Sequence, residues 1–283
     1  MAADRHKRIA PENEAIIKAG GYPAPGGAQI SLGPLVAAAC VGTRSYSPHD
    51  TAGILAAVRA EAPGQTFATR IEVTGESSMN AARRMIEGGH ETVAVLNFAS
   101  ARNPGGGYLG GARAQEEDLC RVSALYTTLL EASDYYAAHR AERDPFYSHR
   151  VIYSPDVPVY RDERYRLLDW PMTVSFLTSP APNAGIVARD RPEQIPRLPA
   201  VLAERAARVL AVAVRHGRRE LVLGAWGCGV FRNDPAAVAD AFRGLLAAGG
   251  PFEGRFTHLV FAVLDRSPQA PNRSAFEDAF AGI

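Results

Sequence analysis

The amino-acid sequence predicts one α/β domain in which helices cover both sides of a sheet. Segments with strand and helix patterns alternate along the chain, as they do in α/β proteins. The segment 92–98, TVAVLNF, is almost continuously apolar, which is typical of a strand buried on both faces. Neither an internal repeat nor a low-complexity linker interrupts the 283 residues, so a single domain is the simplest organisation.

Helix and strand patterns also precede this apolar segment. Gly20 and Gly21 end an N-terminal helical pattern, and a stretch rich in glycine and proline follows as far as Pro34. Ser47 is a suitable N-cap for the next helix, and the strand after it is predicted from alternating apolar and polar residues. The patterns predict, in order, a helix over 1–18, a helix over 48–60, a strand over 66–74 and a helix over 77–87.

Helices and strands continue to alternate after the apolar segment. Leu119, Val122 and Leu129 recur at helical spacing, which predicts one helix over 116–130. The middle of the chain, 144–194, has little periodicity and many prolines and aromatic residues. The remaining predicted elements are short strands over 151–153 and 172–177, a helix over 198–216, a strand over 220–225, a helix over 235–248, a strand over 257–264 and a helix over 274–280.

Composition and charge exclude several classes of protein. Hydrophobic residues make up 47% of the chain and charged residues 22%, which is ordinary for a soluble globular protein and excludes a disordered or coiled-coil chain. The net charge of +1 gives no overall attraction to nucleic acid or to an anionic membrane. All but two of the 31 basic residues are arginines, and their scattered positions favour codon bias over phosphate recognition.

The cysteines and histidines show no metal-binding or disulfide pattern. Cys40, Cys120 and Cys228 form no CxxC pair, and the seven histidines form neither an HExxH motif nor an i,i+4 pair. We therefore expect neither a disulfide framework nor a metal site. Charged residues are frequent in 1–10 and no apolar run follows them, so we expect no signal peptide and no membrane span, with the cytoplasm as the default location.

The most informative segment is 97–120, NFASARNPGGGYLGGARAQEEDLC. A glycine triplet at 105–107 follows the apolar strand closely, and glycine lets backbone N–H groups turn toward an anion. The QEE triplet at 115–117 then opens a helix, whose N-terminus also favours an anion. Composition alone favours ordinary turns and an ordinary acidic first helical turn. The fixed order of the two triplets instead favours a functional site.

This order, GGG, seven residues and then QEE, resembles the signature of poly(ADP-ribose) glycohydrolases, which are catalytic macrodomains. The segment 224–231, GAWGCGVF, follows a predicted strand and is similar to the second, diphosphate-binding loop of macrodomains. The segments 153–160, YSPDVPVY, and 181–183, APN, resemble the compact microbial-type branch of this family.

The resemblance implies a specific fold. It is a macrodomain-like three-layer α/β/α sandwich with a mixed sheet and extra N-terminal helices. Residues 1–283 would form a single catalytic domain of this type. Residues 1–65 would be an N-terminal helical extension packed on it.

The resemblance also implies roles for individual residues. Glu117 corresponds to the catalytic acid/base, Glu116 to the carboxylate that holds ribose hydroxyls, and Asn97 to the asparagine that binds the distal ribose. Phe231 corresponds to the aromatic residue that packs on the distal ribose. The other substrate-binding residues belong to the QEE triplet and the two loops that clasp the diphosphate: Gly105, Gly106, Gly107, Gln115, Gly227, Cys228, Gly229 and Val230.

Two neighbouring carboxylates suit the reaction that this family carries out. Hydrolysis of a ribose–ribose O-glycosidic bond requires a proton on the leaving oxygen and stabilisation of an oxocarbenium-like transition state. Consecutive helical residues lie about 100° apart around the helix axis, so Glu116 and Glu117 are expected to face different parts of the site. Two carboxylates with two tasks fit that geometry.

Other candidate residues are weaker. Cys228 lies in the second loop, but no nearby histidine supports a nucleophile, and a small packed residue is the better interpretation. Core packing is the better interpretation for Trp170 and Trp226. For Arg102 and Arg113, a surface position is at least as good an interpretation as a phosphate contact.

The sequence thus predicts an enzyme that releases ADP-ribose from poly(ADP-ribose) without a metal or an organic cofactor. Its expected partners are poly(ADP-ribose), ADP-ribose and the ADP-ribosylated proteins that carry them, and neither a nucleic-acid duplex nor a membrane. We expect a cytoplasmic monomer. Two alternatives are a module that binds ADP-ribose without cleaving it and a hydrolase that removes mono-ADP-ribose from proteins. The presence of Glu116 and Glu117 favours the enzyme over the binding module.

Overall fold

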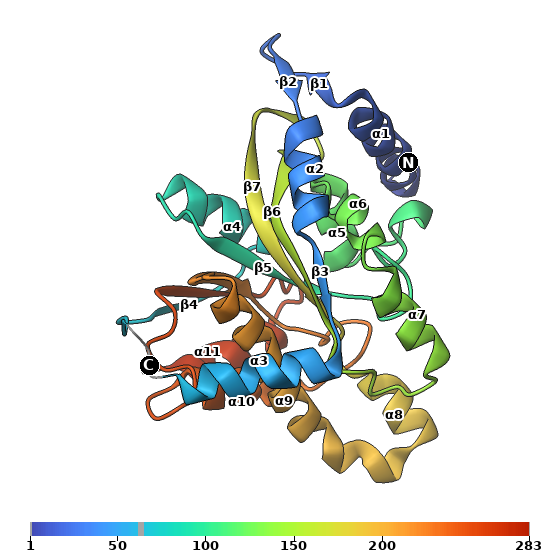
Figure 1. The fold of residues 1–283 in the computed structure, drawn as a ribbon. Helices are drawn as coiled ribbons and strands as arrows, with labels where there is room; N and C mark the ends of the chain where they lie inside the picture. The colour runs from blue at the N-terminus through green and yellow to red at the C-terminus, as the bar shows by residue number, and fades with distance from the viewer. Residues whose placement is uncertain (1, 62–64, 283) are drawn as a thin grey trace.

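A mixed seven-stranded sheet forms the centre of the molecule. The computed structural model describes residues 2–61 and 65–282 (Figure 1). Within these residues the strand order is β3-β6-β7-β5-β8-β9-β4, and the strands from β7 to β4 are parallel while β6 and β3 are antiparallel to their neighbours. The strands are β3 (Arg44–Tyr46), β4 (Arg70–Thr74), β5 (Val93–Phe98), β6 (Val151–Arg161), β7 (Leu167–Ser179), β8 (Glu220–Leu223) and β9 (His258–Ala262).

Helices cover both faces of this sheet, which confirms the three-layer α/β/α sandwich. One face packs against α3 (Pro48–Ala60), α9 (Leu198–Arg215), α10 (Pro235–Leu246) and α11 (Pro271–Phe280). The other packs against α1 (Ala2–Ala19), α2 (Gly33–Gly42), α4 (Ser78–Glu87), α5 (Gln115–Val122), α6 (Leu125–Leu130) and α7 (Ser133–Ala141). The remaining elements are the hairpin β1 (Gly21–Pro23) and β2 (Gln29–Ser31), the helix α8 (Ala184–Asp190) and the 3₁₀ helices η1 (Tyr108–Gly110) and η2 (Pro192–Arg197).

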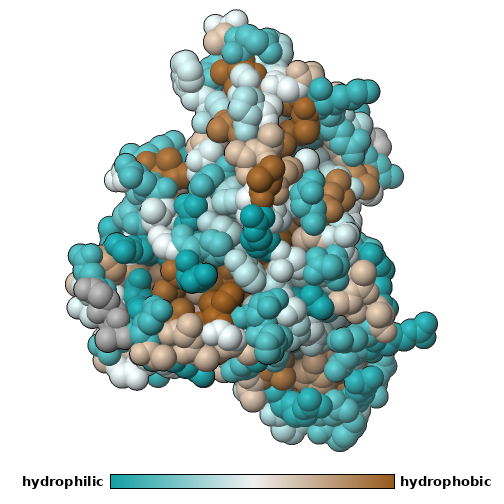
Figure 2. All heavy atoms as spheres, viewed as in Figure 1, coloured by the Kyte–Doolittle hydropathy of each residue, from teal (hydrophilic) through white to brown (hydrophobic). Residues whose placement is uncertain are grey.

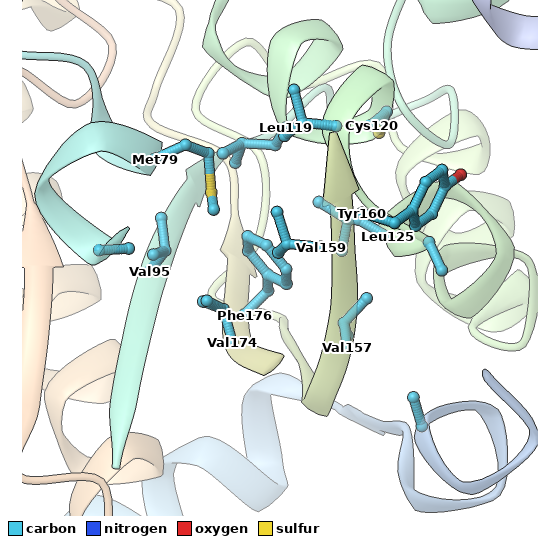
Figure 3. Close-up of a cluster of buried hydrophobic side chains, with 14 of the residues drawn as sticks. Met79, Val95, Leu119, Cys120, Leu125, Val157, Val159, Tyr160, Val174 and Phe176 are labelled. Carbon is cyan, nitrogen blue, oxygen red and sulfur yellow. The ribbon is translucent and has the colours of Figure 1, made fainter. Parts of the chain in front are cut away.

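The apolar strand predicted at 92–98 is β5, and it supplies both cores. Val95 belongs to the core below α4 and α5, whereas Ala94 and Leu96 belong to the core on the opposite face. Successive strand residues point to opposite faces, so a strand buried on both sides is apolar throughout. Figure 3 shows the first of these cores, where Met79 of α4 and Leu119 of α5 lie over side chains of the sheet.

The predicted helix over 116–130 is two helices in the structure. Ser123 pairs with Val159 of β6 in an isolated bridge, and the N–H of Ala124 donates to the carbonyl oxygen of Pro158 at 3.0 Å. These tertiary bonds end α5 and start α6. Apolar spacing alone gave no sign of the break, because the apolar face continues across it.

The strands predicted at 151–153 and 172–177 are much longer in the structure. β6 has 11 residues and β7 has 13, and they form the long hairpin in the centre of Figure 1. Pro155 and Pro158 interrupt the strand pattern of β6, and the register shifts between Ser154 and Val157. Prolines in sheets are tolerated at such irregularities, but they hide the strand from pattern analysis.

Several elements of the N-terminal and middle segments were not predicted. Residues 21–46 contain the β1–β2 hairpin, α2 and β3, and α7 follows α6. Pro34 lies in the first turn of α2, where proline is compatible with a helix. β3 pairs with β6, so the described part of the predicted extension, residues 2–61 and 65, also contributes an edge strand to the main sheet and is not helical throughout; residues 1 and 62–64 lie outside the described residues.

The surface in Figure 2 mixes hydrophilic residues with separate groups of hydrophobic ones. Within the described residues, the structure contains no helix with the length and apolar character needed to cross a membrane. The parallel strands β4, β5, β7, β8 and β9 direct their carboxyl ends to one edge of the sheet. Ligand sites of α/β proteins are found at such an edge.

Candidate active site

A cleft of about 880 Å³ lies at the carboxyl edge of the sheet. The loops that follow β4, β5, β8 and β9 line it, together with the first turns of α4 and α5. Residues of the predicted site in its wall are Gln115, Cys228 and Gly229.

Gln115 ties the start of α5 to the end of β5. Its Oε1 accepts from the N–H of Phe98 at 2.9 Å, and its Nε2 donates to the carbonyl oxygen of Leu96 at 2.8 Å and to Ser78 Oγ at 3.1 Å. The side-chain amide therefore holds the backbone on both sides of Asn97. This is a positioning task, and Gln115 also lines the cleft, so the substrate contact that the family resemblance implies stays a prediction.

The loop after β5 that contains the glycine triplet at 105–107 is called the first loop below. Glu116 is buried beneath it, with an exposed fraction of 2%. Its Oε2 accepts from the N–H of Ser100 at 2.6 Å, and its Oε1 accepts from Asn97 Nδ2 at 3.3 Å. Burial raises the pKa of Glu116 to about 8; the two hydrogen bonds oppose that rise, and the neighbouring Glu117 charge adds to it. This carboxyl group is therefore mostly protonated near neutral pH.

Glu117 faces a different part of the same loop, as the helical spacing predicts. Its Oε1 accepts from the N–H of Gly107 at 2.8 Å. Its Oε2 is also buried, and it has no hydrogen-bond partner within the described residues. A buried carboxylate oxygen without a partner is costly in free energy, so this atom is poised to receive one.

The glycine triplet wraps around the two carboxyl groups. Gly105 and Gly106 have φ angles of 65° and 59°, which glycine adopts readily. A Cβ at position 106 would lie 2.5 Å from Glu117 Oε1 and 3.0 Å from Glu116 Oε2. The N–H groups of Gly106 and Gly107 donate to Asn103 and Glu117, so the first loop uses them to hold itself and a carboxylate.

Asn97 is the penultimate residue of β5 and is completely buried. Its Nδ2 donates to Thr178 Oγ1 at 3.1 Å as well as to Glu116. Its Oδ1 has no hydrogen-bond partner within the part of the chain that the structure describes. The sequence did not single out Thr178; it pairs with Asn97 across β5 and β7, and only knowledge of that strand order would have identified it.

The second loop is anchored at its base and open at its tip. Trp226 is buried and donates from Nε1 to the carbonyl oxygen of Ser179 at 3.0 Å. Gly227 has a φ of 76°, and Asn233 Nδ2 donates to its carbonyl oxygen at 3.1 Å. Among the described residues, no protein acceptor bonds the N–H groups at the tip, those of Gly229, Val230 and Phe231. Successive unbonded N–H groups of this kind can bind an anion.

Several residues weighed in the sequence analysis now have definite positions. Burial raises the pKa of the Cys228 thiol to about 12, so it is not an activated nucleophile, as expected. Trp226 lies in the core as predicted, but the prediction for Trp170 was wrong: its exposed fraction is 78%. Trp170 lies in the first half of β7, which is more exposed than the second half. Arg113 lines the cleft and donates to His6 Nδ1 at 3.2 Å, whereas Arg102 is exposed.

The N-terminal helix supports the first loop from behind. Asn13 of α1 is buried, and its Nδ2 donates to Tyr108 Oη at 3.1 Å and to the carbonyl oxygen of Arg121 at 3.0 Å. Arg161 Nε of β6 donates to Asn13 Oδ1 at 2.8 Å. The sequence analysis missed Asn13, because a single polar residue in an exposed-looking helix carries no motif.

No group of three or more histidine, cysteine, aspartate or glutamate side chains that could hold a metal ion occurs within residues 2–61 and 65–282. The site is instead built from two neighbouring carboxyl groups, an asparagine and a loop of open N–H groups. Such a set can donate and accept protons, hold hydroxyl groups and bind an anion.

Comparisons with known proteins agree with this chemistry. The family model described as microbial-type PARG, catalytic domain, matches residues 10–162. The crystal structure of poly(ADP-ribose) glycohydrolase from Thermomonospora curvata is 50% identical and superposes with a TM-score of 0.93, covering 98% of this chain and 100% of that one. The same enzyme bound to the inhibitor ADP-HPD is similar at 49% identity and a TM-score of 0.91, with the same coverage.

A second enzyme is also similar. Poly(ADP-ribose) glycohydrolase from Deinococcus radiodurans in complex with ADP-ribose is 50% identical, with a TM-score of 0.83 over 88% of this chain and 98% of that one. A comparison with curated protein sequences gave no match.

Proposed function

The chain belongs to the family of microbial-type poly(ADP-ribose) glycohydrolases, and on that basis we propose a role for each side chain of the candidate site. The enzyme cleaves the ribose–ribose O-glycosidic bonds of poly(ADP-ribose) and releases ADP-ribose. Glu117 is the general acid and base, Glu116 and Asn97 hold ribose hydroxyls, and the second loop binds the diphosphate.

The unpartnered Oε2 of Glu117 is the observation that carries the assignment. Oε1 is fixed by the N–H of Gly107, so the orientation of the carboxyl group is set before substrate binds. Oε2 then gives its proton to the leaving ribose oxygen as the glycosidic bond breaks. The same carboxylate takes a proton from the water that attacks the anomeric carbon, which restores the acid.

Glu116 and Asn97 hold the distal ribose. The raised pKa of Glu116 keeps its carboxyl group mostly protonated near neutral pH, so only one negative charge is added to the site when Glu117 is ionised. Asn97 Oδ1 is buried without a partner, and a ribose hydroxyl can donate to it. Phe231 packs its ring on the same ribose.

The diphosphate rests mainly on the second loop. The N–H groups of Gly229, Val230 and Phe231 are open at the tip, whereas those of Gly106 and Gly107 are already used in the first loop. The first loop then serves the carboxylates, and its contribution to the diphosphate is smaller than the resemblance suggests.

Incubation with two substrates tests this function. Purified protein is mixed with poly(ADP-ribose) or with a mono-ADP-ribosylated protein, and free ADP-ribose is measured by chromatography. We expect rapid release from the polymer. Binding of ADP-ribose without release from either substrate would support the binding module, and release from the protein alone would support the mono-ADP-ribosyl hydrolase.

We also propose that the enzyme is a cytoplasmic monomer that acts on ADP-ribosylated proteins and binds neither nucleic-acid duplexes nor membranes. The unpaired cysteines Cys40, Cys120 and Cys228 support a reducing location. The net charge of +1 supports the absence of duplex binding. Sedimentation of the purified protein tests the monomer.

A further inference from the structure

Tyr147 has a strained backbone close to the proposed site. Its φ is 56°, in the left-handed region that bulky residues rarely adopt. It lies in the loop between α7 and β6, which Figure 1 shows next to α8. Backbone strain of this kind persists only where the surrounding structure imposes it, and it is frequent at functional sites.

A buried arginine holds this loop from one side. Arg205 of α9 is fully buried and donates to the carbonyl oxygens of Pro180 at 2.8 Å, Phe146 at 2.7 Å and Tyr147 at 3.3 Å. Burial lowers the pKa of Arg205 to about 10. A buried guanidinium is tolerated only when its N–H groups are hydrogen-bonded. Moving these carbonyl oxygens away from Arg205 would therefore cost free energy, and this fixes the position of the loop.

A neutral histidine holds the loop from the other side. His139 Nδ1 lies 3.0 Å from the carbonyl oxygen of Tyr135, which can only accept, so Nδ1 is the donor and Nε2 is the acceptor. Nε2 then accepts from the N–H of Ser148 at 3.2 Å and from Ser148 Oγ at 2.7 Å. Burial lowers the pKa of His139 to about 4, which keeps this arrangement intact at neutral pH.

The ring of Tyr147 is thereby placed against Phe231. The centroids of the Tyr147 and Phe231 rings are 5.8 Å apart. The His139 ring also contacts the Tyr147 ring in a T-shaped arrangement, with the centroids 6.0 Å apart. Phe231 itself belongs to the second loop, whose neighbouring residues Gly229 and Val230 are exposed. Tyr147 is thus a rigid contact for an aromatic residue in an otherwise open loop.

We propose that Tyr147 is a positioning residue that fixes the Phe231 ring over the distal ribose. This inference rests on the role proposed above for Phe231. A ring that is already oriented loses less conformational entropy when substrate binds, so the contact improves both affinity and the alignment of the scissile bond. The hydrogen bonds of the buried Arg205 and of His139 keep Tyr147 in this position despite the strain of its backbone.

A double-mutant cycle with Phe231 tests the proposal. Tyr147→Gly removes the ring and accepts the left-handed φ, and Tyr147→Asn serves if the glycine variant unfolds. We expect Tyr147→Gly to weaken ADP-ribose binding and to lower kcat/KM for poly(ADP-ribose), each about tenfold. In a Phe231→Ala background the same change should have less than about a twofold effect, because a positioning residue acts only through its partner.

Two controls make the outcome decisive. Tyr147→Phe keeps the ring and should retain wild-type affinity. Tyr46→Ala removes a half-buried tyrosine ring that contacts His216 instead, and it should leave affinity unchanged at comparable stability.

Three results would overturn the proposal. They are wild-type affinity in Tyr147→Gly, an equal loss in both backgrounds, and a loss in Tyr147→Phe as large as in Tyr147→Gly. If Phe231→Ala alone bound normally while the wild type still released ADP-ribose, the role of Phe231 would fail and the glycohydrolase function would stand.

Discussion

At Gly106 the sequence motif and the structure give two different reasons for a glycine. The sequence predicted a glycine that lets the backbone approach a phosphate, and the structure adds a nearer reason. The backbone of Gly106 passes so close to both carboxyl groups that any side chain would displace them. The position is therefore restricted twice, by its φ and by its neighbours.

Replacing Gly106 with valine is expected to abolish tight binding and turnover. The left-handed backbone costs about 1–3 kcal/mol with a bulky residue, and the new side chain would push Glu117 from its bond with Gly107. We expect ADP-ribose affinity measured by calorimetry to fall at least about tenfold. Gly110→Ala is the matched control, since no atom lies within 4 Å of a Cβ there, and it should bind normally. Normal binding by Gly106→Val would instead show that the loop tolerates a side chain.

Glu116 gives the enzyme a distinct dependence of stability on pH. Its pKa is raised from 4.5 to about 8 in the folded state, so between these values the native protein holds a proton that the unfolded chain has lost. The contribution of Glu116 to the free energy of unfolding then falls as pH rises, by about 1.4 kcal/mol per pH unit within that window. Below pH 4.5 both states are protonated and the effect vanishes.

Glu116→Gln removes this titration. We expect the variant to gain stability relative to the wild type as the pH rises from 5 to 7.5, in urea unfolding followed by circular dichroism. It should also weaken ADP-ribose binding, because the proposed ribose contact exists in both ground state and transition state. Glu91→Gln, at an exposed position, serves as the control. A constant difference between Glu116→Gln and the wild type across this range would contradict the buried, protonated state.

The sequence predicted which residue types form the site, but not how they are bonded. The GGG and QEE order placed Glu116, Glu117 and the first loop together, and all of them meet in the structure. The unpartnered oxygens of Asn97 and Glu117 depend on contacts across β5, β7 and the loop, and no spacing along the chain encodes them. Tyr147 was missed for the same reason, since its position depends on a buried arginine 58 residues away.

At the scale of elements, the buried side chain of Asn13 connects α1 to the first loop. Asn13 joins α1 to Tyr108 beside the glycine triplet, to α5 and to β6. Removing the Asn13 side chain would leave Arg161 Nε without its acceptor, and Arg161 is buried, with an exposed fraction of only 5%. Buried polar groups of this kind cost about 1–3 kcal/mol when unpaired.

Asn13→Ala is therefore expected to lower the free energy of unfolding by about 2–3 kcal/mol and to weaken ADP-ribose binding through the loosened first loop. Glu14→Ala, on the exposed side of the same helix, should change stability by less than about 0.5 kcal/mol. Chemical denaturation of both variants measures the difference. Equal stability of the two variants would mean that α1 is held by apolar packing alone.

Helices and strands could be predicted where the sequence pattern that specifies them lies within the element and its caps. The helix at 48–60 begins at a Ser47 cap with a reciprocal bond from Asp50, and its predicted bounds are confirmed. β6 and β7 were largely missed because prolines and bulges interrupt their alternation, and the sheet pairing that stabilises them is not local. The break between α5 and α6 is likewise caused by a bridge to β6, which the helical spacing does not contain.

At the scale of the whole molecule, the enzyme is expected to work without a divalent ion. Within the described residues no cluster of metal-ligating side chains exists, and backbone N–H groups can hold the diphosphate. Release of ADP-ribose from the polymer should continue at an unchanged rate in excess EDTA. Loss of turnover in EDTA that a divalent ion restores would contradict the metal-free mechanism.

Turnover and affinity of Glu117→Gln, measured side by side, test the catalytic assignment most directly. Glutamine keeps the size of the side chain and the acceptor for the Gly107 N–H, but it has no titratable proton. Release of ADP-ribose should fall by at least ~10²–10⁴-fold, while ADP-ribose affinity stays within a few-fold and circular dichroism is unchanged. Hydrolysis near the wild-type rate would contradict Glu117 as the general acid, and a parallel loss of affinity in a folded variant would make it a binding residue instead.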